Sequence, residues 1–131
     1  MRLFLLRHGM TEANERRLYC GRTDLPLSPA GEAALRQLRP RLQLPEGLAL
    51  YASGMLRAAQ TLAVYFPGAA YTVLPGLRET DFGDFEGKGY EELKDTAAYQ
   101  SWLAADPERT APPDGESPAQ VLARAQQAVQ P

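Results

Sequence analysis

Cysteine is scarce in this 131-residue chain, and long apolar runs are absent from its N-terminus. The single cysteine, Cys20, cannot form an internal disulfide, and cysteine-based metal sites need several ligands at defined spacing. The apolar run at residues 3–6 is stopped by Arg7 and His8, far short of a signal-peptide core or a membrane span. We therefore expect a cytoplasmic protein that has no membrane partner and no metal.

The chain also lacks a large excess of charge of either sign. The formal net charge is -2, and the lysine and arginine residues are spread along the chain, so no basic patch is expected for nucleic acid. Hydrophobic residues make up 44% and charged residues 23%, which is typical of one globular domain. A small molecule is the expected partner, and the sequence leaves open whether the chain forms a homodimer.

Strands and helices are predicted to alternate along the chain. The N-cap Ser28 before Pro29 and leucines at helical spacing predict a helix over 29–42, and Ser53 is a candidate cap for a second helix. Strands are predicted at 3–6, 48–52 and 71–74, shorter helical pieces within 90–103, and a last helix from Ser117 and Pro118 onward. This order predicts an α/β three-layer sandwich, a mostly parallel sheet flanked by helices, incomplete at its C-terminal side.

Polar side chains that suit a phosphate group follow each predicted strand. Arg7 and His8 follow the first strand, Arg57 follows the second, and Glu79 follows the third. Ligands of open α/β sheets bind beyond the carboxyl ends of the strands, where these residues should converge. Arginine matches phosphate oxygens with paired hydrogen bonds, and Gly9 should let the backbone approach an anion closely.

Several motifs of this chain resemble those of the histidine phosphatase superfamily, whose fold is that of the phosphoglycerate mutases. The first is Leu6-Arg7-His8-Gly9-Met10-Thr11-Glu12-Ala13-Asn14. The others, in order, are Gly21-Arg22-Thr23-Asp24-Leu25-Pro26-Leu27-Ser28, Ala52-Ser53-Gly54-Met55-Leu56-Arg57, Leu77-Arg78-Glu79 with the loop through Gly87, and Gly115-Glu116-Ser117 with Arg124. Together they cover nearly the whole chain in the order of the family.

The resemblance implies a phosphomonoester hydrolase that acts through a phosphohistidine on His8. Neighbouring arginines should favour the uncharged imidazole, and Glu79 should give a proton to the leaving alkoxide and later take one from water. The implied phosphate-binding residues are Arg7, Asn14 and Arg57, and the implied substrate loop comprises Gly21, Arg22 and Thr23. No cofactor and no metal are implied, and the partner would be a small phosphorylated metabolite.

Single residues have simpler interpretations as well. Arg57 alone would be read as a solvated helix residue in a salt bridge, and Glu86 competes with Glu79 for the role of proton shuttle. Asn14 is of a type that also serves loops without any ligand. Nothing near Cys20 indicates a thiol with a lowered pKa, so it is expected to be inert. Ser117 is interpreted as a helix cap.

One departure from the family pattern concerns histidine. The family has a second histidine, which contacts the bound phosphate and follows a later strand, but this chain has one histidine in total. Losing one such donor can cost roughly 10²–10³ in rate. We expect residues 1–131 to be the N-terminal portion of a single histidine-phosphatase domain, poorly stable and weakly active alone; a shortened relative without activity is the other explanation.

Within the superfamily the loops are most similar to those of the α-ribazole phosphatases, which dephosphorylate a precursor of cobalamin. The short segment between Gly87 and Gly115 favours a phosphatase over a phosphoglycerate mutase, which has longer insertions around its substrate. Two alternatives stay open. One is a phosphoglycerate mutase-type phosphotransferase, and the other is a non-catalytic phosphate-binding module.

Overall fold

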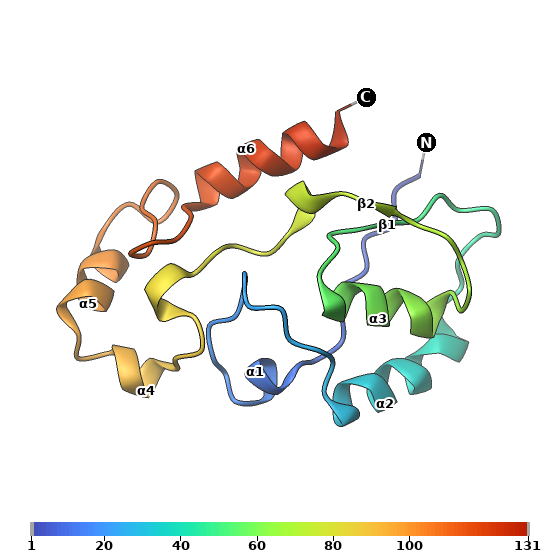
Figure 1. Cartoon of the computed structure of the whole chain (residues 1–131), viewed down its shortest axis with the longest axis horizontal. Coiled ribbons are helices and arrows are strands. Elements are labelled where there is room, and N and C mark those ends of the chain that lie inside the picture. The colour runs from blue at the N-terminus through green and yellow to red at the C-terminus, as the bar shows by residue number, and fades with distance from the viewer. Residues whose placement is uncertain (1, 131) are drawn as a thin grey trace.

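The computed structural model describes residues 2–130, which contain helices and a small parallel sheet joined by long loops (Figure 1). The helices are α1 (Glu12–Glu15), α2 (Pro29–Leu38), α3 (Leu56–Tyr65), α4 (Tyr90–Leu93), α5 (Ala97–Ala104) and α6 (Pro118–Val129). The strands are β1 (Tyr51–Ala52) and β2 (Thr72–Val73), and the 3-10 turns are η1 (Arg39–Arg41), η2 (Pro75–Leu77) and η3 (Gly83–Phe85).

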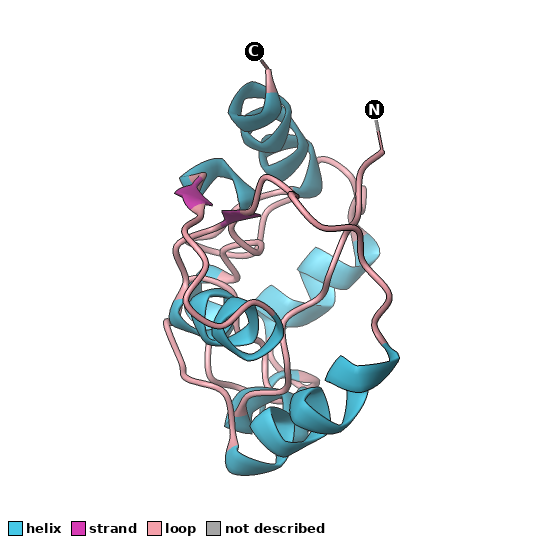
Figure 2. Ribbon diagram, turned by 90° about the vertical axis from the view of Figure 1, so that its right-hand side faces the viewer, coloured by secondary structure: helices cyan, strands magenta, loops and turns pink. Residues whose placement is uncertain are grey.

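The sheet consists of β1 and β2, which run parallel with α3 between them in the chain. Tyr51 lies opposite Thr72 and Ala52 opposite Val73. The strands are much shorter than the predicted 48–52 and 71–74, and Figure 2 shows them as two small arrows within long loops. The β-α-β order that the sequence predicts is therefore confirmed for the second and third predicted strands.

The strand predicted at 3–6 does not form. Leu3 is 76% exposed and Leu5 is 86% exposed, whereas Phe4 and Leu6 between them are 40% and 41% exposed. This alternation shows an extended segment with one side turned toward the protein. No backbone hydrogen bond joins residues 3–6 to any other part of the described chain. The prediction of a strand buried on both faces is wrong, because these residues have neither a ladder partner nor a covering layer.

A stability measurement can test this exposure. Leu5→Ser is expected to change the free energy of unfolding by less than about 0.5 kcal/mol, since an exposed side chain loses no packing. Leu35→Ala removes most of a buried side chain of α2 and is expected to lower the free energy of unfolding by about 2–5 kcal/mol. Urea unfolding followed by circular dichroism measures both. A cost above about 2 kcal/mol for Leu5→Ser would show that the segment is packed in solution.

The helix boundaries follow local chemistry at some ends and tertiary contacts at others. Ser28 and Ser117 cap α2 and α6, as predicted, by accepting from the backbone N–H of Gly31 and Gln120. The helix predicted over 29–42 ends at Leu38 and continues as a 3-10 turn that contains Pro40. Ser53 does not cap α3; its hydroxyl accepts from Met55 N, and Asp24 accepts from Leu56 N at 2.7 Å instead.

Two apolar clusters hold the helices and loops together. Leu27, Leu35 and Val64 pack where α2 lies against α3. The second cluster is aromatic and joins the loop around η3 to α4 and α5; its buried members are Phe85, Leu93 and Tyr99, and Tyr19, Phe82 and Trp102 pack against them. The acid-rich loop is thus anchored on one side by buried rings, which fixes where its carboxylates lie.

Candidate active site

His8 lies just after the extended N-terminal segment and is half-buried. Its Nδ1 is 2.6 Å from the carbonyl oxygen of Gly9. A carbonyl oxygen can only accept, so Nδ1 carries the proton in the neutral ring. The lone pair is then on Nε2, which is the nitrogen free to act as a nucleophile.

The surroundings of His8 lower its pKa below the ordinary 6.5. Burial is the largest cause, and the positive charges of Arg57 and Arg7 act in the same direction. The hydrogen bond to Gly9 and the negative charge of Glu79 oppose it without reversing it. The charges of Arg7, Arg57 and Glu79 therefore all act on His8, and the lowered pKa favours the uncharged ring at neutral pH.

Gly9 serves packing rather than anion binding. Its N–H donates to Thr61 Oγ1 at 3.0 Å, and that hydroxyl donates in turn to Arg57 O. A Cβ at this position would lie 2.7 Å from Leu35 Cδ1. The Gly9 N–H is thus already bonded within the protein, and the missing side chain makes room for α2; close approach of an anion to the backbone here stays a prediction.

Arg57 is buried in the first turn of α3 and is only 2% exposed. Its NH1 donates to Thr23 O at 3.0 Å and its NH2 donates to Gly21 O at 2.9 Å. The interpretation of Arg57 as a solvated residue in a salt bridge is therefore wrong. The guanidinium holds the carbonyl side of the loop 21–23 while its charge acts on His8.

Glu86 holds the opposite, N–H side of the same loop. Its carboxylate accepts from the backbone N–H of Gly21, Arg22, Thr23 and Phe82 and from the Thr23 hydroxyl. Burial by itself would raise the pKa of Glu86, but these hydrogen bonds outweigh burial and lower the pKa. A carboxylate so fully engaged is a poor proton donor, which disfavours Glu86 as the shuttle.

The remaining predicted residues are exposed or partly buried. Glu79 is exposed, and its Oε1 accepts from Thr80 N at 2.9 Å. Arg7 is exposed, and Asn14 is oriented by Thr11, whose N–H and hydroxyl donate to Asn14 Oδ1. Arg22 lies 3.5 Å from Asp81 and 3.4 Å from Asp114. Within residues 2–130, Asn14 Nδ2 makes no protein hydrogen bond, and the phosphate-binding role of Asn14 stays a prediction.

Sequence reasoning missed the partnership of Arg124 and Glu116. Arg124 Nε and NH2 donate to the two Glu116 oxygens at 2.9 and 2.8 Å. The two residues are eight positions apart, and Glu116 lies before the helix that carries Arg124, so no helical i,i+4 spacing points to the pair.

Three further observations concern Cys20, metal binding and membrane spans. Burial raises the pKa of the Cys20 thiol, which fits an inert cysteine. In residues 2–130 no three histidine, cysteine or acidic side chains come together in a way that could hold a metal ion. Over the same residues, none of the helices has the length and apolar character needed to cross a membrane.

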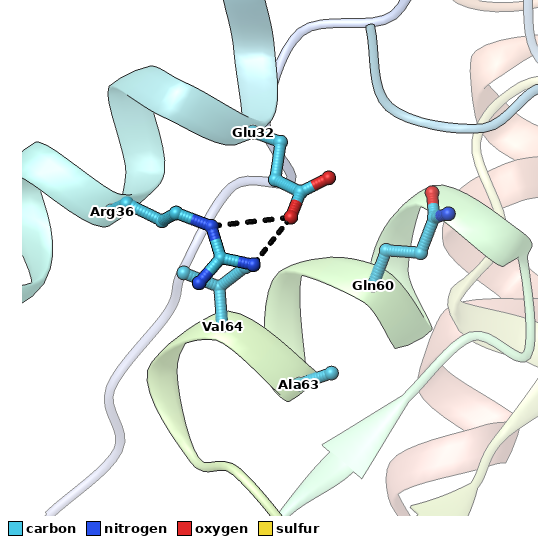
Figure 3. Close-up of a pocket in the computed structure, with 5 residues that line it drawn as sticks. All are labelled: Glu32, Arg36, Gln60, Ala63 and Val64. Carbon is cyan, nitrogen blue, oxygen red and sulfur yellow. Dashed lines mark hydrogen bonds and ion pairs between the residues drawn. The ribbon is translucent and has the colours of Figure 1, made fainter. Parts of the chain in front are cut away.

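A shallow hollow lies away from these residues, between α2 and α3 (Figure 3). Arg36 and Glu32 of α2 form an ion pair of 2.6 Å across one side of it, and Gln60, Ala63 and Val64 of α3 line the other. None of the predicted catalytic or phosphate-binding residues lines this hollow. Gln60 accepts from Leu27 N, so it serves the packing of the chain before α2.

Comparison with known structures identifies the fold of this chain. The structure matches that of a putative α-ribazole-5'-phosphate phosphatase from Escherichia coli with a TM-score of 0.82 and 26% identity, over 93% of this chain and 62% of the other. The predicted phosphoglycerate mutase-like fold is confirmed. The profile of the histidine phosphatase superfamily, branch 1, matches residues 3–131. The chain belongs to that superfamily.

Two curated relatives carry different names. An adenosylcobalamin/α-ribazole phosphatase of Salmonella typhimurium is 33% identical over 120 residues, which are 88% of this chain and 59% of the relative. A probable phosphoglycerate mutase, GpmB, of an Enterobacter species is 30% identical over 132 residues, which are 98% of this chain and 61% of the relative. The chain thus spans about three fifths of the length of these relatives.

Proposed function

We propose that this chain carries the nucleophile half of a phosphomonoesterase site, in which His8 Nε2 takes up the phosphoryl group. The observation that carries this proposal is the state of His8: its Nδ1 is bonded to Gly9 O, and burial and two arginines keep the ring uncharged. The predicted roles of Arg7, Arg57, Asn14 and Glu79 depend on the same geometry. Membership in the superfamily supports a phosphorylated small molecule as the substrate.

The proposed reaction has two steps. In the first, Nε2 attacks phosphorus, the bond to the ester oxygen breaks, and the Glu79 carboxyl gives a proton to that oxygen. In the second, the Glu79 carboxylate takes a proton from water, the water oxygen attacks phosphorus, and Nε2 leaves as the neutral ring. Arg7 and Arg57 would stabilise the charge on the equatorial phosphate oxygens in both steps.

The substrate we propose is of the α-ribazole phosphate type. The named relatives of similar sequence and structure support it, as does the short segment between Gly87 and Gly115. A phosphoglycerate mutase-type activity is the second candidate, because the GpmB relative aligns with 98% of this chain. The two candidates share the histidine chemistry and differ in whether water or a second hydroxyl collects the phosphoryl group.

A labelling experiment combined with a substrate panel tests the proposal. The protein is incubated with a radiolabelled phosphodonor, and we expect acid-labile, base-stable phosphate on His8. The panel compares α-ribazole phosphate, phosphoglycerates and nitrophenyl phosphate, with stoichiometric protein so that one turnover suffices. Phosphate exchange between positions of phosphoglycerate would favour the mutase, and binding of phosphate without labelling would leave a non-catalytic module.

The pH dependence of His8 gives a further prediction. Since His8 is the chain's one histidine, its ring signals in a proton NMR titration are unambiguous. We expect the midpoint below 6.5, and a lower midpoint in Glu79→Gln, because the carboxylate opposes the lowering of the pKa. The folded chain binds this proton less readily than the unfolded chain, so stability from this group should fall as the pH drops below 6.5. A midpoint at or above 6.5 would contradict the proposed environment of His8.

A further inference from the structure

The structure places Arg124 of α6 directly against the segment that carries Glu79. Figure 1 shows α6 beside the turn that follows β2, and α6 packs on η2. Glycine at position 76 allows α6 to pack closely on this turn, because a Cβ there would lie 2.6 Å from Ala128 Cβ and 2.7 Å from Arg124 O. The Arg124 side chain is 23% exposed, so its guanidinium is largely enclosed.

Every N–H of the Arg124 guanidinium has an acceptor. NH1 donates to the carbonyls of Gly76 and Arg78 at 2.7 and 2.8 Å, and NH2 donates to the carbonyl of Glu79 at 2.9 Å. The other NH2 hydrogen and Nε–H go to Glu116. A guanidinium has five such donors in a fixed plane, so this side chain fixes the backbone of residues 76–79 in one conformation.

Glu116 completes the arrangement from the other end of the segment. Its Oε2 accepts from Asp81 N at 3.0 Å, and its own N–H donates to Asp81 O at 2.8 Å. The hydrogen bond from Arg124 is the largest cause that lowers the pKa of Glu116, so the carboxylate is ionised at neutral pH. The backbone on both sides of Glu79 is therefore held by one ion pair.

We infer that Arg124, itself oriented by Glu116, is a positioning residue that places the Glu79 carboxyl for proton transfer at the His8 site. The inference rests on the proposed function. Arg124 makes all its contacts to the protein and leaves no donor for a phosphate oxygen. Its effect on the reaction must pass through Glu79, whose side chain extends from the backbone that Arg124 holds.

Leaving groups of different basicity separate this role from a general structural one. A glycerol phosphate needs a proton on its leaving oxygen, whereas nitrophenolate leaves without one. Arg124→Lys keeps the charge but supplies three donors instead of a planar fork. We expect it to lower the single-turnover rate of alcohol release from the alkyl ester by about 10-fold or more, and that of nitrophenol release from nitrophenyl phosphate by less than about 3-fold.

The same pattern should appear in Glu79→Gln, and Arg124→Lys should add less than about 2-fold in that background. Arg36→Lys, the same substitution in an exposed ion pair of α2, is the matched control and should change neither rate. If Arg124→Lys fails to fold, Glu116→Gln removes the charge that orients Arg124 and should give a weaker form of the same pattern.

The NMR titration of His8 provides a readout that does not need turnover. If Arg124 places Glu79, Arg124→Lys should move the His8 midpoint downward, toward that of Glu79→Gln. Equal losses on both esters with an unchanged His8 midpoint would overturn the inference while leaving the proposed function intact. Absence of labelled His8 in the wild-type protein would overturn both.

Discussion

Replacement of His8 by alanine is expected to reduce phosphoryl transfer to background, a loss of roughly 10³-fold or more, because no other group can form the covalent intermediate. His8→Asn should be equally inactive even though its amide can still donate toward Gly9 O. The readouts are the single-turnover release of nitrophenol and the acid-labile label.

The free energy of unfolding distinguishes loss of the nucleophile from loss of the folded state. His8 is half-buried and makes one local hydrogen bond to its neighbour, so the free energy of unfolding should change by about 1 kcal/mol or less in both variants. Activity in His8→Asn above a few per cent of wild type would show that another residue carries the phosphoryl group. Label retained in both variants at wild-type level would show the same.

Arg57→Lys should affect both rate and stability. The buried guanidinium donates to Gly21 O and Thr23 O and acts on His8, and a lysine ammonium cannot reproduce the planar pair of contacts. We expect a rate loss of about 10²–10³ from the weakened stabilisation of phosphate charge. A destabilisation of about 1–3 kcal/mol should follow from the unpaired carbonyls.

Arg16→Lys is the matched control for Arg57→Lys. Arg16 forms an exposed i,i+4 ion pair with Glu12, at 3.5 Å, and its replacement should change the free energy of unfolding by less than about 0.5 kcal/mol. The rate should equal that of wild type. If Arg57→Lys were indistinguishable from Arg16→Lys in both measurements, Arg57 would have neither the structural nor the proposed phosphate role.

The choice between two acidic residues shows where sequence reasoning reached its limit. Glu79 and Glu86 lie in one acid-rich loop, and their spacing alone leaves both as candidates for the shuttle. Hydrogen bonds from residues more than sixty positions away, at Gly21, Arg22 and Thr23, engage the Glu86 carboxylate. The tertiary arrangement of the loops determines which donors reach this carboxylate, so no local sequence pattern predicts them.

The strand predicted at residues 3–6 shows a different limit, because there the sequence pattern gave a wrong prediction. Its apolar run is locally convincing, and residues 3–6 do alternate in exposure as an extended chain should. A strand, however, needs a neighbouring backbone to bond with and layers that cover its faces. Both depend on distant parts of a chain, so the composition of four residues cannot decide whether they form.

The sequence alone determined the superfamily, the caps at Ser28 and Ser117, and the position of His8 beside Arg7, because motifs and caps depend on residues near one another in the chain. Tertiary structure decided that Glu86 binds the loop 21–23, that Arg124 holds the backbone of Glu79, and that residues 3–6 stay exposed. These outcomes depend on contacts between segments that only folding brings together.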